Sequence, residues 1–210
     1  MVKASKPDRA RNLGDLEFLR EVYFSGLRGN ARVSAIGKRL GASAPVVRSC
    51  LRTLESRRLV AVRKGSASLT TLGRKRLKVV MMGGAFEIIH PGHVYALSEA
   101  RKLGNTLVVV VATDESVERN KGRPPATSQA SRVALVSSLR PVDLALPGNR
   151  GSIFEILVRV RPDVVALGYD QHHNGDEIVR EAAKRGVRLS TARLGSPIPD
   201  VKTSKILLSM

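Results

Sequence analysis

The sequence has few acidic and few aromatic side chains. Its 210 residues include 18 Asp and Glu against 36 Lys and Arg, a net charge of +18, and aromatic residues make up 3% of the chain with no Trp. Few rings are available to stack on single-stranded bases, whereas a strongly cationic surface attracts the phosphate backbone of a duplex. If the chain binds a nucleic acid, we therefore expect double-stranded DNA.

Cysteine and long apolar runs are also scarce. Cys50 is the single cysteine, which excludes an internal disulfide, and with four histidines the chain cannot supply a Cys-rich zinc site. No apolar run approaches the roughly 20 residues of a membrane-spanning helix. The basic N-terminus lacks the apolar stretch of a secretory signal. These absences predict a globular, cytoplasmic protein with no membrane partner.

The positive charge is distributed unevenly along the chain. Residues 1–79 hold 19 Lys and Arg against 5 Asp and Glu, whereas residues 80–210 hold 17 against 13. The hydrophobic pattern changes at the same place, from short amphipathic helices to apolar strands that alternate with helices. We expect a flexible basic tail over 1–11, a small basic domain over 12–78 and a larger domain over 79–210.

The small domain has the pattern of three helices, a hairpin and a last short helix capped by Thr71. The helices are expected at 14–27, 34–40 and 44–57, and the hairpin strands at 59–63 and 67–70. This order resembles the winged helix-turn-helix family, in which the third helix enters the major groove of DNA. The resemblance implies DNA contacts from four cations, Arg48, Arg52, Arg63 and Lys64. The alternative is a docking or dimerisation module whose charges are simply solvated.

The larger domain alternates apolar strands with helices, which predicts an α/β fold with a doubly wound parallel sheet. Strands are expected at 79–82, 106–112, 144–146, 164–167 and 188–192, and helices at 94–103, 130–138, 153–159 and 176–185. Ligands of such sheets bind beyond the carboxyl ends of the strands. The rim loops expected there are 83–93, 113–123, 168–173 and 193–205.

The segment 83–93 is the densest in chemical groups. Two glycines follow a strand and allow a ligand to approach closely, and Gly92 opens a helix whose amides and dipole favour phosphate. His90 and His93 lie three residues apart, so both imidazoles can face one anion. The segment resembles the Gly-Thr-Phe-Asp-x-x-His-x-Gly-His signature of the cytidylyltransferase-like nucleotidyltransferases, whose fold is Rossmann-like. Ala85 replaces the usual Thr and Glu87 the usual Asp.

The resemblance implies nucleotidyl transfer and assigns roles to individual residues. The catalytic residues implied are His90, His93, Lys121 and Arg132, which would stabilise the charge on the α-phosphoryl group. The nucleotide-binding residues implied are Gly84, Ala85, Phe86, His90, Pro91, Gly92, His93, Asp170, Arg193, Thr203 and Ser204. A divalent metal, by default Mg²⁺, would arrive with the nucleoside triphosphate, and no metal-ligand set is expected in the protein itself.

Within this family, the runs around the histidines look most like the archaeal FAD synthetase branch. Its members transfer AMP from ATP to FMN and release pyrophosphate. The alternative within the fold is a CTP-dependent cytidylyltransferase that acts on glycerol 3-phosphate or a similar acceptor. An alternative of another class is a DNA-binding regulator whose second domain senses a nucleotide or a flavin. We expect a homodimer, since both families implied here commonly pair.

Overall fold

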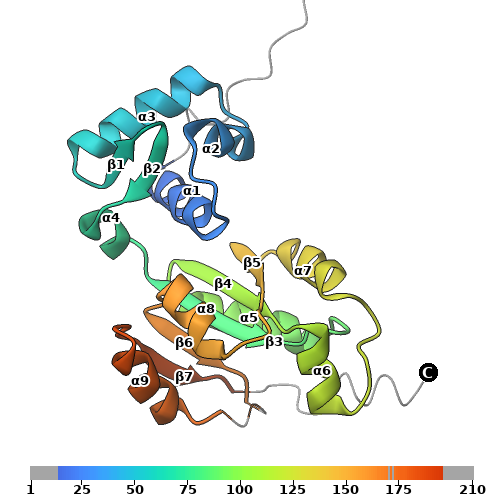
Figure 1. Cartoon of the computed structure of the whole chain (residues 1–210). Coiled ribbons are helices and arrows are strands. Elements are labelled where there is room, and N and C mark those ends of the chain that lie inside the picture. Colours follow the sequence, from blue (N-terminus) through green and yellow to red (C-terminus); the bar gives the residue numbers. More distant parts are fainter. Residues whose placement is uncertain (1–13, 170, 172, 196–210) are drawn as a thin grey trace, which may run out of the picture. The chain divides into compact units, whose positions relative to one another are not determined.

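The computed structural model describes residues 14–169, 171 and 173–195, and the chain divides into two compact units, Met1–Leu77 and Lys78–Met210 (Figure 1). The expected basic tail over 1–11 lies outside the described residues. No helix in the described ranges is both long enough and apolar enough to cross a membrane.

The described part of the first unit consists of short helices and one hairpin. Its elements are α1 (Asp15–Leu27), α2 (Val33–Leu40), α3 (Ala44–Ser56), β1 (Val60–Arg63), β2 (Ser66–Leu69) and α4 (Thr71–Lys75). Lys64 and Gly65 form the hairpin turn with φ of 48° and 74°, and two positive φ values give the turn a twist that matches the flanking strands. An antiparallel bridge between Arg32 and Ser66 attaches the segment before α2 to the hairpin.

The start of α4 differs from the expectation. The cap is Thr70 and not Thr71, because the Thr70 hydroxyl accepts a hydrogen bond from the Gly73 N–H at 3.0 Å. The same hydroxyl donates to the Arg58 carbonyl at 2.6 Å, and the Leu59 carbonyl oxygen lies 3.2 Å from it. A Cβ at position 73 would lie 1.9 Å from the Leu59 carbonyl oxygen, so the close approach of α4 to this backbone requires glycine.

The second unit is built on a five-stranded parallel sheet (Figure 1). Its elements are β3 (Val79–Gly84), α5 (Pro91–Lys102), β4 (Thr106–Val111), α6 (Asp114–Lys121), α7 (Gln129–Ser137), β5 (Leu144–Pro147), α8 (Ile153–Val160), β6 (Val164–Leu167), α9 (Gly175–Lys184) and β7 (Ser190–Arg193). The strand order is β5-β4-β3-β6-β7, so the chain builds the sheet outward from β3 first to one side and then to the other. The α/β class and the parallel sheet predicted from the sequence are confirmed.

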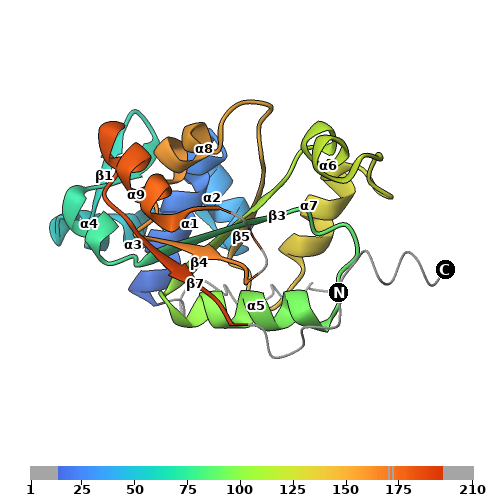
Figure 2. The ribbon, with the colours of Figure 1, turned by 90° about the horizontal axis from the view of Figure 1, so that it is seen from below.

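The two faces of the sheet are covered by different helices. Val80, Met82 and Val109 face a buried cluster that includes Leu97 of α5 and Val136 of α7. Figure 2 shows α8 and α9 on the opposite side of the sheet from α5. Because both faces are covered, β3 and β4 are buried for almost their whole length, which explains their unbroken apolar sequences.

Helix α6 occupies part of a segment that the sequence predicted to be a rim loop, 113–123. Thr113 caps it by accepting from the Ser116 N–H at 3.1 Å, and Gly122 ends it in the left-handed region with φ of 71°. Val117 is the only buried residue of α6. The helix therefore carries capping signals but no apolar stripe, and the prediction depended on the stripe.

Candidate functional site

A cavity of about 660 Å³ opens at the carboxyl ends of β3, β4 and β6. This is where the strand order reverses, between β3 and β6, and such reversal points are the usual ligand sites of open parallel sheets. Apolar side chains form much of its wall, among them Met81, Val110, Ile153, Ile156 and Val165. Its polar lining includes Thr113, Ser116, Asn120, Lys121, Asn149 and Gln171. The cavity thus combines an apolar wall with a few polar groups, as sites for small organic ligands do.

The chain leaves β3 through a tight turn. Phe86 adopts a left-handed conformation with φ of 51°, and its ring is buried. A Cβ at Gly84 would lie 2.8 Å from this ring, so the glycine makes room for it. The ring centroid of Phe86 lies 5.3 Å from that of His93. Gly84 and Ala85 line the cavity, whereas Phe86 supports a histidine.

His90 and His93 come together at the first turn of α5. His90 is the N-cap residue and Pro91 is the first helical residue. The two imidazole centroids lie 4.0 Å apart. Both side chains are half-buried. The first turn of a helix carries a partial positive charge, so a pair of imidazoles here is suited to an anion.

Two of the residues predicted to contact phosphate, Lys121 and His90, line different hollows. Lys121 lines the 660 Å³ cavity, whereas His90 lines an open hollow with Ile89, Val94 and Tyr95.

Glu87 is the residue whose role the sequence did not reveal. Its buried carboxylate accepts from Lys121 Nζ at 2.6 Å, from Arg123 Nη1 at 2.6 Å and from the Ala126 N–H at 3.0 Å. Burial alone would raise the pKa of Glu87, but the hydrogen bonds from Arg123, Lys121 and Ala126 outweigh it and lower the pKa to about 2. The resemblance assigned Lys121 to phosphates, and the structure adds that it is paired with a carboxylate.

Arg132 lies beneath the site and not on its surface. Its side chain is 1% exposed and donates to backbone carbonyls of Ala85, Ala112 and Thr127 and to the Asp114 carboxylate. These partners lie after β3, after β4, before α7 and at the start of α6. The geometry therefore favours a role in holding the ends of two strands together, in place of the direct charge stabilisation that the resemblance implied.

Arg193, at the end of β7, contacts the loop that follows β6. It donates to the carbonyls of Gly168 at 3.0 Å, Gln171 at 2.7 Å and His173 at 2.7 Å. Gln171 in turn donates to the Gly83 carbonyl at 2.8 Å. The loop is thus tied to both β3 and β7. Three further predicted ligands, Asp170, Thr203 and Ser204, lie outside the described residues and remain predictions.

Metal ligands were not expected in the protein itself. Within the described ranges there is no group of three or more His, Cys, Asp or Glu side chains that could hold a metal ion.

The family model described as Cytidylyltransferase-like matches residues 81–207, which include the cavity, both histidines and Glu87. The chain belongs to the cytidylyltransferase-like family. Among the curated proteins, it is 48% identical over 115 residues to "FAD synthase" of Aciduliprofundum boonei, covering 55% of this chain and 76% of that one. It is 38% identical over 125 residues to "FAD synthase" of Picrophilus torridus, covering 60% of this chain and 89% of that one.

A solved structure supports the same fold for this cytidylyltransferase-like chain. The crystal structure of "the lipopolysaccharide core biosynthesis protein" from Thermoplasma volcanium is 40% identical, with a TM-score of 0.55. The match covers 57% of this chain and 98% of that one. The resemblance of the His-Pro-Gly-His segment to the cytidylyltransferase-like family is therefore confirmed.

The family match contains no residue of the first unit. From residue 14 onward, that unit has three helices, a hairpin and a short helix, and all four cations predicted to contact DNA are exposed: Arg48, Arg52, Arg63 and Lys64. The winged helix-turn-helix assignment, the DNA contacts and the homodimer remain predictions.

Proposed function

We propose that this chain is an FMN adenylyltransferase, which makes FAD by transferring AMP from ATP to FMN. The observation that carries the proposal is the His90–His93 pair at the start of α5, in a chain that is 48% identical over 115 residues to a protein named FAD synthase and that has a cavity at the carboxyl ends of its strands. The family match and the FAD synthase relatives support a nucleotidyltransferase that acts in FAD synthesis.

The reaction is an in-line displacement at the α-phosphorus of ATP. An oxygen of the FMN phosphate forms a new bond to this phosphorus, while the bond to the bridging oxygen of the β-phosphate breaks and pyrophosphate leaves. No covalent enzyme intermediate is required, so catalysis depends on positioning and on charge stabilisation.

The residues of this chain divide that work. His90 and His93 face the α-phosphoryl group and stabilise the charge that develops on its oxygens. Lys121 contributes a cation from the wall of the cavity. Magnesium bound to the triphosphate would neutralise part of the phosphate charge, as it commonly does in phosphoryl transfer. The chain's own groups then orient the phosphates for attack.

The experiment measures pyrophosphate release by the purified full chain with magnesium, crossing ATP and CTP against FMN and glycerol 3-phosphate. Release with ATP and FMN alone supports the proposal. Release with CTP and glycerol 3-phosphate overturns it in favour of a cytidylyltransferase. Nucleotide binding without turnover in any combination overturns it in favour of a sensor.

A second candidate function is the binding of double-stranded DNA by the first unit. The observation that favours it is that, among its described residues, the acidic side chains of this unit are used in internal contacts, whereas several of its cations are exposed without an acidic partner. Each acidic side chain in the described part of this unit serves an internal contact. Glu17 accepts from the Gly14 N–H, Glu21 from Arg39, Glu55 from the Val62 N–H, and Asp15 from Arg57.

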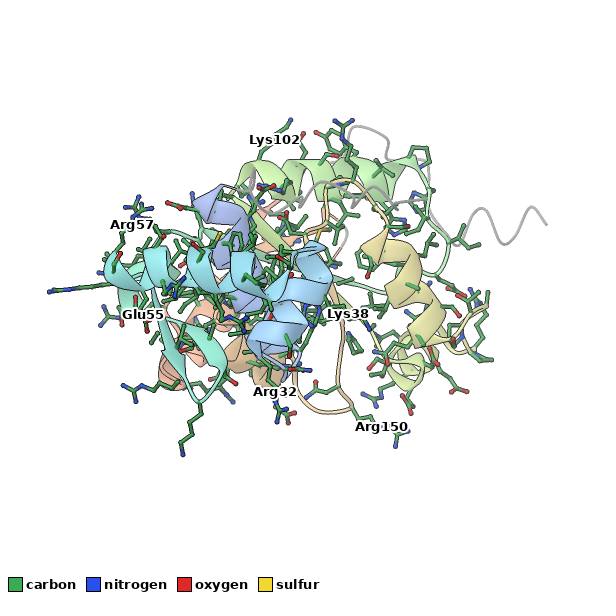
Figure 3. All side chains as sticks on the ribbon, turned by 90° about the horizontal axis from the view of Figure 1, so that it is seen from above. Arg32, Lys38, Glu55, Arg57, Lys102 and Arg150 are labelled. Carbon is green, nitrogen blue, oxygen red and sulfur yellow. The ribbon has the colours of Figure 1, made fainter. Side chains whose placement is uncertain are left out.

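The exposed cations are arranged differently. Arg48 and Arg52 lie one turn apart on the exposed face of α3, opposite the buried Val47 and Leu51. Arg63 and Lys64 lie at the tip of the hairpin, and Arg32, bridged to the hairpin, and Lys38 are further exposed cations of this unit (Figure 3). None of these six cations forms an ion pair within 4.0 Å with the residues the structure describes.

Binding to a fluorescent 20-base-pair duplex, followed between 50 and 200 mM salt, tests this function. For four phosphate contacts we expect log K to fall against log salt with a slope of about −3.6, and the Arg48→Ala/Arg52→Ala variant to reduce the slope by about 2. The control, Lys102→Ala/Lys184→Ala, removes the same charge from two exposed pairs of the second unit. Equal losses in both variants, or no binding by the wild type, would overturn the assignment.

A further inference from the structure

Glu87 joins two segments that lie far apart in the sequence. Its Oε1 accepts from Arg123 Nη1 and the Ala126 N–H, and its Oε2 accepts from Lys121 Nζ and from Arg123 Nη2 at 3.2 Å. All four donors belong to the end of α6 and the residues that follow it, while Glu87 itself follows β3. One carboxylate therefore holds the segment 121–126 against the loop that leads to the histidines.

The two cations that contact Glu87 are used differently. Arg123 directs both of its terminal nitrogens at the carboxylate, and Nη1 also donates to the Pro124 carbonyl at 3.0 Å. Lys121 has three N–H donors, of which Glu87 takes one. Its side chain remains 32% exposed and lines the cavity, whereas Arg123 is not among the residues of the cavity wall.

We propose that Glu87 is a positioning residue that fixes the Lys121 ammonium at the cavity wall, while Arg123 holds the Glu87 carboxylate in place. The remaining N–H groups of Lys121 bind the phosphate chain of the nucleotide. The inference rests on the proposed adenylyl transfer and deepens it. It also assigns different roles to the two cations, since Lys121 touches the substrate and Arg123 acts only through Glu87.

Releasing the Glu87 carboxylate from its cations would cost stability. A fully buried carboxylate that loses its cations is strongly destabilising, because no water replaces them. A nucleotide therefore adds to the Glu87–Lys121 pair and does not displace it. Fixing the lysine in advance also removes the side-chain entropy that a flexible four-carbon arm would otherwise lose on binding.

The length of the Glu87 side chain allows the carboxylate to reach all of its donors. Glutamate reaches one methylene further than aspartate, and here its two oxygens meet three side-chain N–H groups and one backbone N–H. Glu87→Asp keeps the charge but shortens the reach, while Glu87→Gln keeps the reach but removes the charge. The two variants separate the effects of charge and of geometry.

The experiment measures KM for ATP, KM for FMN, kcat and the dissociation constants of Mg–ATP and of pyrophosphate for the wild type, Glu87→Gln, Glu87→Asp and Arg123→Ala. The matched control is Glu99→Gln, which breaks the exposed Glu99–Lys102 pair on α5. We expect Glu87→Gln and Arg123→Ala to raise KM for ATP and weaken pyrophosphate binding about tenfold, the worth of one charge-assisted hydrogen bond. KM for FMN should stay unchanged, and Glu87→Asp should recover part of the loss.

Three outcomes would overturn the inference. Unchanged ATP and pyrophosphate affinities in folded Glu87→Gln would show that the lysine needs no anchor. Tighter ATP binding by Glu87→Gln would show that Glu87 competes with the nucleotide for the Lys121 ammonium. Equal losses for ATP and FMN would show a general structural role. Because the binding measurements do not require turnover, a wild type that binds Mg–ATP but makes no FAD refutes the proposed function and leaves the role of Glu87 measurable.

Discussion

Arg132 donates to the Asp114 carboxylate at 2.7 Å while its guanidinium lies almost completely buried. The same Nη2 donates to the Ala112 carbonyl at 2.8 Å, and Nε donates to the Thr127 carbonyl at 3.2 Å. Asp114 begins α6, so the guanidinium links that helix to the end of β4. A planar guanidinium has five donors and serves four acceptors here, whereas an ammonium has only three donors.

We expect Arg132→Lys to destabilise the second unit by about 3 kcal/mol, because the substitution leaves buried carbonyls without donors. Urea unfolding followed by circular dichroism measures the effect, with Arg140→Lys at an exposed position as the control. A stability loss below about 1 kcal/mol together with a large fall in kcat would instead support the direct catalytic role.

The histidine pair gives a sharper kinetic prediction. We expect His90→Ala and His93→Ala each to lower kcat about 10²- to 10³-fold, as expected for the loss of one group that stabilises the transition state. Unfolding free energy should change little, since both side chains are only half-buried. Lys102→Ala, at the opposite end of α5, is the control (Figure 3). Turnover within threefold of the wild type in either histidine variant would remove that histidine from the mechanism.

The sheet could be predicted because its strands are buried on both faces. Val79–Gly84 and Thr106–Val111 read as apolar runs for this reason, and the residues that follow them fall at the ligand-binding edge. The two histidines could be predicted as a pair because they lie only three residues apart, and the structure places His90 at the N-cap and His93 in the first turn of α5. Local patterns thus identified most of the framework and the first turn of α5.

The contacts of Glu87 could not be predicted in the same way. Its partners Lys121 and Arg123 lie 34 and 36 residues away, and no local pattern specifies which of many cations reaches a given carboxylate. The same holds for Arg132, which was assigned by resemblance to the phosphates but meets carbonyls as far away as Ala85, 47 residues earlier. Long-range pairing of charges depends on the fold, so it became visible only in the structure.

Gly84→Ala tests the turn that follows β3. The added Cβ would lie 2.8 Å from the Phe86 ring, which must move, and this ring packs beside His93. We expect a loss of about 1–3 kcal/mol in stability, typical of overpacking, together with lower kcat. Gly83→Ala is the matched control for stability, because its nearest neighbour would be the Val110 carbonyl at 3.9 Å. Equal stability of the two variants would contradict the proposed contact.

We expect the stability of the chain at low pH to depend on Glu87. Hydrogen bonds from Arg123, Lys121 and Ala126 overcome the effect of burial and lower the pKa of Glu87 from 4.5 to about 2 in the folded chain. A carboxyl with a lowered pKa stabilises the folded state above its unfolded pKa and loses that contribution as pH falls through the folded value. We expect the free energy of unfolding of the wild type to exceed that of Glu87→Gln by on the order of 2 kcal/mol at pH 7. This difference should disappear as the pH falls from 4.5 to 2.

Glu181 provides the comparison that tests how burial affects the salt sensitivity of the Glu87 contacts. Lys184 and Arg185 also lower its pKa to about 2, but the Glu181 side chain is 26% exposed and its partners lie on or next to the same helix, α9. Salt screens exposed charges far more than buried ones. The stability difference between the wild type and Glu181→Gln should therefore be small and should shrink in 1 M salt, whereas that of Glu87→Gln should persist. Equal salt sensitivity in urea unfolding of the two variants would show that the Glu87 pair is open to solvent.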